Sequence, residues 1–286
     1  MKKVFLIALL TLGFTQLRAQ EGVVFKIKYL PGKTYKSDVN LVVKIDADVT
    51  GDPGLMDKLK SAGITSPVKI DVEMSASGLT QSGSVKADGS FPLDLSYKIN
   101  KFIVSANGHQ APIPPTISEK GMKIAAHVDK DGIMEVDSAS GRKADDSTKV
   151  KMKQMMGFFQ RQIKFPDNAL KPGDSFTQSS PLNIPLGKKV GGEIKINYAV
   201  TYKLISIADG KAYFDVIPNF SMDFGIGNTI TANITGSGTG KLIYSIKDSF
   251  PLSNTGDFIM TFKVTSPQTK VDAKGSITSN STAAIN

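Results

Sequence analysis

The stretch Ile194-Lys195-Ile196-Asn197-Tyr198-Ala199-Val200-Thr201-Tyr202-Lys203-Leu204 alternates apolar and polar side chains along its length. Successive side chains of a β-strand point to opposite faces of a sheet, so this period of two predicts a strand with one apolar and one wet face. The same alternation recurs along the chain, at 39–49, 68–76, 91–99, 242–246 and 258–264. Strands buried on one face only are typical of antiparallel sheets, so the sequence predicts a mainly β (α+β) fold.

Turn chemistry supports hairpins between these strands. Asp-Gly sequences favour tight hairpin turns. Three of them stand between alternating runs, at Ala87-Asp88-Gly89, Lys130-Asp131-Gly132 and Ala208-Asp209-Gly210.

Helical periodicity is confined to two segments. A helix over 145–164 is predicted by capping oxygens at its start, by Pro166 after its end and by apolar residues three or four positions apart. Those apolar residues are Met152, Met155, Met156, Phe159 and Ile163. A shorter helix is predicted from Pro53 to Ala62, ahead of Gly63.

The two halves of the chain share a pattern. Leu30–Tyr35 and Lys171–Phe176 both contain Pro-Gly, a charge, a hydroxyl residue and an aromatic ring, and an Ala-Asp-Gly turn follows each. We therefore expect two pseudo-repeat halves, 20–144 and 165–286, joined by the helix 145–164. Chance similarity between hairpin-rich segments is the alternative.

The predicted architecture is a curved antiparallel sheet, or two such halves forming an open barrel, with the amphipathic helix packed on the apolar face. Carriers of the lipoprotein-localisation type look similar, by architecture alone. A sheet whose apolar face meets membrane lipid would alternate in the same way, which is the structural alternative.

The N-terminus has the order of a secretory signal. Met1-Lys2-Lys3 is basic, Val4–Phe14 is almost wholly apolar, and Ala19 is small. We expect a signal peptide over 1–19, a mature chain (20–286) that begins at Gln20 or Glu21, and a periplasmic or extracellular location. The sequence holds no cysteine, which excludes a lipid-modified cysteine, thiol catalysis and thiolate metal centres.

Charge and hydropathy argue against a nucleic-acid partner and against a second membrane segment. Without Lys2, Lys3 and Arg18, 32 basic residues face 26 acidic ones, a net charge of +6. No run of five like charges occurs, so we expect no nucleic-acid partner. No later stretch approaches the roughly 18 apolar residues of a membrane-spanning helix.

Motifs for chemistry are incomplete. Gly236-Ser237-Gly238-Thr239-Gly240-Lys241 lacks the spacing of a phosphate-binding loop and precedes a predicted strand, so we interpret it as a strand start or bulge. His109 and His127 have no serine-nucleophile motif beside them, and Asp129, Asp131 and Asp137 lack calcium-loop spacing. The sequence predicts no catalytic residue, metal or cofactor, and no enzyme.

The hypothesis that remains is non-catalytic binding of an apolar or amphipathic ligand, a small molecule or lipid, in the concavity of the sheet. Its predicted lining is Met155, Met156, Phe159, Ile163, Tyr198 and Tyr202. The alternative is a structural or interaction module of the cell envelope in which the same residues form a closed core. An enzyme of unknown type comes third.

A family resemblance agrees with export. Ala19-Gln20, Phe165-Pro166 and Leu170–Phe176 resemble secreted proteins of the Bacteroidota that are grouped as an uncharacterised domain of unknown function. The similarity covers most of the mature chain and implies an exported, β-rich protein. Members of that family have no assigned activity, so the resemblance transfers no site residues.

Overall fold

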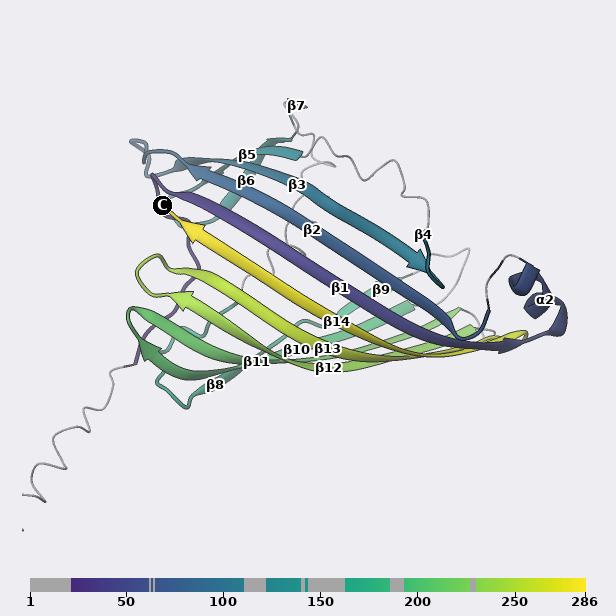
Figure 1. Cartoon of the computed structure of the whole chain (residues 1–286). Helices are drawn as coiled ribbons and strands as arrows, with labels where there is room; N and C mark the ends of the chain where they lie inside the picture. The colour runs from purple at the N-terminus through teal and green to yellow at the C-terminus, as the bar shows by residue number, and fades with distance from the viewer. Residues whose placement is uncertain are drawn as a thin grey trace, which may run out of the picture.

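The computed structural model describes residues 22–61, 63, 65–110, 122–139, 142–143, 163–185, 193–226 and 230–286. They form one antiparallel sheet of 14 strands and one short helix (Figure 1). The elements are β1 (Thr34–Gly51), α2 (Pro53–Ser61), β2 (Val68–Ser82), β3 (Phe91–Ala106), β4 (His109–Gln110), β5 (Met122–Val128), β6 (Met134–Ala139), β7 (Arg142–Lys143), β8 (Ser175–Ser179), β9 (Leu182–Pro185), β10 (Glu193–Ala208), β11 (Lys211–Ile226), β12 (Ile230–Ser245), β13 (Phe250–Thr265) and β14 (Thr269–Ile285). The prediction of a mainly β fold is confirmed.

The sheet is continuous. Its spatial order is β7-β6-β5-β3-β2-β1-β14-β13-β12-β11-β10-β8, with β4 beside β3 and β9 beside β10. The first and last long strands pair along their whole lengths, from Tyr35 opposite Ile285 to Gly51 opposite Thr269. Within the described residues β7 and β8 do not pair with each other, so the sheet is open. Figure 1 shows that it is curled, with the β9–β10 edge folded back behind the central strands.

Glycines in β12 permit a close approach to β13. A Cβ at Gly238 would lie 2.3 Å from the carbonyl oxygen of Asp257, and one at Gly240 would lie 2.3 Å from that of Thr255. No other residue type fits such spacing. The interpretation of Gly236–Lys241 as a strand start is therefore wrong, because this stretch is the interior of a long strand whose missing side chains let the neighbouring strand come close.

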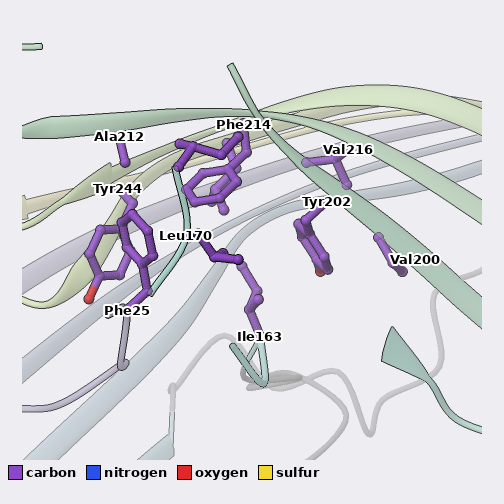
Figure 2. Packing of buried hydrophobic residues seen from close by; sticks show 11 residues of the cluster. Phe25, Ile163, Leu170, Val200, Tyr202, Ala212, Phe214, Val216 and Tyr244 are labelled. Carbon is purple, nitrogen blue, oxygen red and sulfur yellow. The ribbon is translucent and has the colours of Figure 1, made fainter. Parts of the chain in front are cut away.

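Buried apolar side chains gather in two clusters on the same side of the sheet, which we call the inner face. The first cluster combines strands β10–β12 with Phe25, Ile163 and Leu170, which face Tyr202, Phe214 and Tyr244 in Figure 2. The second cluster belongs to β3 and β5, and its members are Phe91, Leu93, Leu95, Ile124, Ala126 and Val128.

The N-terminal segment 22–33 connects the two clusters. Phe25 belongs to the first cluster, and Tyr29 packs against the second. Backbone pairing fixes its start, because Val23 and Leu170 exchange N–H···O hydrogen bonds of 2.9 Å. The irregular segment 22–33 thus packs on the inner face of the sheet and covers part of both clusters.

The two Pro-Gly turns share two local features. Gly32 and Gly173 both adopt a positive φ, 69° and 100°, which a glycine allows without strain. The N–H of Gly32 donates to the carbonyl of Gly83 at 3.1 Å, and that of Gly173 donates to the carbonyl of Leu204 at 2.7 Å. Gly83 directly follows β2, the strand beside β1, and Leu204 lies in β10, the strand beside β8, so each turn is held next to the strand that it starts. The duplication of the chain stays a prediction.

The helix predictions have different outcomes. The short one is confirmed, since α2 spans Pro53–Ser61. The long one, 145–164, lies outside the described residues except for Ile163 and Lys164, which are not helical. Its packing on the apolar face is therefore unsupported. Among the described residues, no helix has the length and apolar character that crossing a membrane requires.

Candidate functional site

A wide apolar band covers the inner face beyond the two clusters. Cross-strand pairing aligns inward side chains of neighbouring strands; Val43, for example, lies opposite Val72 of β2 and Ile277 of β14. The band includes Leu41, Val43 and Ile45 of β1, Val72 and Met74 of β2, Phe102 and Val104 of β3, Ile277 of β14, Phe258, Met260 and Phe262 of β13, Ile234 of β12, Phe220, Met222 and Phe224 of β11, and Ile196 and Tyr198 of β10.

The band is only half-buried. The described part of the chain has 20 buried apolar residues, and all but three of them, Tyr35, Ala47 and Ala273, belong to the two clusters. The band residues are of intermediate exposure. Soluble proteins rarely leave such wide apolar surfaces to water, so this surface is suited to contact with an apolar group.

The opposite, outward face is polar. Lys44 and Asp46 of β1 and Lys274 of β14 are exposed, and Asp46 lies directly opposite Lys274. Lys263 of β13 lies opposite Asp272. Charges of both signs on the central strands indicate that the outward face is in contact with water. The inner face is the apolar face of the sheet.

Three of the predicted lining residues lie within the described chain. Tyr202 is a core residue, 8% exposed, and its ring stacks on Phe176 with centroids 5.0 Å apart. Burial, with a smaller contribution from Tyr198, raises the pKa of Tyr202 to about 12. Ile163 is buried in the first cluster, and Tyr198 is half-buried against it. Tyr202 and Ile163 are therefore core residues, whereas Tyr198 belongs to the half-buried apolar band.

Met155, Met156 and Phe159 lie outside the described residues. The sequence prediction missed most of the band, because it singled out the residues of one helix and one strand. The signal for the band was present in β1, β11 and β13, because every second residue of these strands, the one that faces inward, is apolar along most of the strand.

The polar residues considered for chemistry serve local structure or face solvent. Nδ1 of His127 on β5 lies 2.8 Å from a carboxylate oxygen of Asp137 on β6, and both side chains are accessible to solvent. The carboxylate of Asp129 accepts the N–H groups of Asp131 and Ile133, which defines the β5–β6 turn. His109 is exposed in β4. No group of three metal-ligating side chains occurs in the described part of the chain.

Comparisons with known proteins place the chain in no family. No family model matches it, and no curated protein matches it by sequence. Among solved structures it is similar to a bacterial polysaccharide outer membrane secretin, with 9% identity over 86% of this chain and 97% of the other, at a TM-score of 0.29.

Two other solved structures have comparable likeness. An outer membrane channel from Pseudomonas putida F1 has 9% identity over 90% and 97% of the two chains, at a TM-score of 0.21. An exported protein with a YmcC-like fold from Bacteroides fragilis has 8% identity over 89% and 98%, at a TM-score of 0.20. At TM-scores this low, the similarities carry no argument about fold or function.

Proposed function

We propose that the protein is exported and binds the apolar part of a lipid or another amphipathic small molecule on the inner face of its sheet, without catalysis. The observation that carries the proposal is the half-buried apolar band across β1–β3 and β10–β14. The signal-like residues 1–19 support export.

The chemistry of the band suits an acyl chain. Met74, Met222 and Met260 have flexible, polarisable side chains that adapt to ligands of different shape. Phe220, Phe258 and Phe262 offer large apolar areas beside them. A hydrocarbon chain gains about 0.8 kcal/mol for each CH₂ that it buries, so a surface of this width supports binding without any charged anchor.

A structural module with a closed core is the second candidate. The observation that favours it is Ile163, which is buried in the first cluster directly after the undescribed segment 144–162. If that segment packs its apolar residues on the band, the protein has a dry core and no room for a ligand. The two candidates therefore compete for the same surface.

Native mass spectrometry of protein purified from its host, followed by lipid extraction, tests the first candidate. We expect a bound species that delipidation removes, and displacement of a fluorescent fatty-acid analogue by phospholipid. A ligand-free spectrum together with no binding of the fatty-acid analogue would reject the proposal in favour of the closed module.

A pair of variants on β11 locates the binding surface. Met222 faces the band, and Ile217 is on the outward face with 42% of its surface exposed. Met222→Gln should weaken binding of the fatty-acid analogue about tenfold, which corresponds to roughly 1.4 kcal/mol of lost apolar contact. Ile217→Gln is the matched control and should bind like the unmodified protein.

A further inference from the structure

The outward face of β10–β13 has a hollow that the proposed function does not use. Its volume is about 690 Å³, within the range of small-molecule sites. It runs across the strands, because its floor is the backbone of one cross-strand row, Tyr198, Phe220, Gly236 and Met260. The side chains of this row point the other way, to the inner face, so the two sites share no side chain. Its sides are the two adjacent outward rows and the connection between β8 and β9. We call it the transverse trough.

The trough is uncharged on a face that is otherwise charged. None of its 14 lining residues is acidic or basic. The next outward row toward the α2 end of the strands carries Lys195, Asp223 and Lys263, and Asp257 stands in the row on the other side. A charged ligand would find no counter-ion within the trough, so the ligand that fits it is neutral.

The walls of the trough offer free hydrogen-bonding groups. Asn219 and Ser237 lie opposite each other on β11 and β12, near its centre. In the described part of the chain their side chains have no hydrogen-bond partner, so the amide and the hydroxyl are available to a ligand. The neighbouring pair Thr235 and Thr261 is held by a hydroxyl–hydroxyl contact of 2.9 Å.

An apolar surface stands directly beside these groups. Ile259 lies opposite Ser237 and is 68% exposed, the highest fraction among the exposed large hydrophobic residues of the described chain. Sugar rings combine hydroxyl edges with C–H faces, so a saccharide would pair its hydroxyls with Asn219 and Ser237 and place a C–H face on Ile259.

A peptide fits the trough less well. Extended peptides bind sheets chiefly through backbone hydrogen bonds at a free edge. Here the floor strands are paired on both sides, and the trough crosses them at right angles to the direction that an added strand would take. Only side-chain groups remain for recognition, which suits a ligand rich in hydroxyls.

We infer that the transverse trough is a second binding site, on the opposite face from the apolar band, and that it takes a neutral carbohydrate chain. The side-chain amide of Asn219 and the hydroxyl of Ser237 bind the sugar hydroxyls. This site is independent of ligand binding on the inner face, so either proposal can fail without the other.

A glycan array of neutral and anionic saccharides, probed with the mature protein at low and physiological salt, tests the inference. We expect binding to at least one class of neutral glycan that persists at physiological salt. The double variant Asn219→Ala/Ser237→Ala should weaken that binding about tenfold, since it loses two hydrogen bonds. Asn40→Ala is the matched control, because Asn40 is an exposed outward asparagine on β1, away from the trough.

Three results would overturn the inference. One is the absence of binding to any neutral glycan. Another is binding restricted to anionic glycans and lost on adding salt, which is what the net positive charge alone would give. The third is equal weakening by the double variant and by Asn40→Ala. All three substituted residues are exposed or outward-facing, so circular dichroism should show that the variants fold normally.

Discussion

The rings of Phe25 and Tyr244 meet edge to face, with centroids 5.3 Å apart and an interplanar angle of 82°. The hydroxyl of Tyr244 also donates a hydrogen bond of 2.5 Å to the backbone carbonyl of Lys26. Strand β12 is thus fastened to the N-terminal segment by a ring contact and a hydrogen bond together. Because Phe25 also packs on Phe165 and Phe214, it closes the first cluster from the inner side.

Replacing Phe25 should therefore destabilise the whole sheet. We expect Phe25→Ala to lower the free energy of unfolding by about 3–5 kcal/mol, the cost of emptying a buried aromatic site. Val24→Ala is the control, because Val24 is half exposed and should change stability by less than about 0.5 kcal/mol. Urea unfolding followed by circular dichroism measures both. Equal effects would show that the N-terminal segment contributes no core.

The close approach of β12 and β13 gives a second prediction. Gly238→Ala would place a methyl group 2.3 Å from the carbonyl oxygen of Asp257, so the two strands must separate. We expect a loss of about 1–3 kcal/mol or more, as for other overpacked sites. Gly225→Ala on β11 meets its nearest atom at 4.0 Å and should be tolerated. Thermal unfolding of the two variants decides, and equal midpoints would contradict the argument.

The sequence predicted β1 and β13 well, because their inward residues are large. The alternation at 39–49 lies within β1, that at 258–264 lies within β13, and the Asp-Gly turns fall between paired strands. Large apolar side chains at every second position are a strong signal because a one-residue shift would expose all of them.

Strand β14 escaped prediction for the opposite reason. Its inward positions include Ala273, Gly275 and Ser279, which are too small or too polar to show a period of two. It is nevertheless the strand that joins β1 to β13, and it is fixed by pairing with both. Long-range pairing of this kind leaves little trace in local composition.

The apolar band was missed for a related reason, since it exists only when eight separate strands are aligned.

Alkaline pH should destabilise the protein through its buried tyrosines. Burial raises the pKa of Tyr202 from 10.0 to about 12, and burial also raises the pKa values of Tyr35 and Tyr244. The folded state then keeps protons that the unfolded chain loses above pH 10, so stability is complete below that pH and falls as the pH rises toward 12.

The measurement is urea unfolding at a series of alkaline pH values, together with the ultraviolet absorbance of tyrosinate. Tyr202→Phe should reduce the slope of stability against pH in this window, because one of the shifted groups is removed. A slope that the substitution leaves unchanged would show that Tyr202 ionises as readily in the folded protein as in the unfolded chain.

Cysteine labelling distinguishes an open inner face from a closed one. The natural chain has no cysteine, so a single introduced thiol reports on one position without background. Met222→Cys places the thiol on the apolar band, and Ile217→Cys places it on the outward face of the same strand.

If the band is open to ligand, both thiols should react with a water-soluble maleimide at comparable rates. Added fatty acid should then slow the reaction of Met222→Cys alone. If the chain closes its own core, the thiol of Met222→Cys should react orders of magnitude more slowly and only through unfolding, with or without fatty acid. The first pattern supports ligand binding on the inner face, and the second rejects it in favour of the structural module.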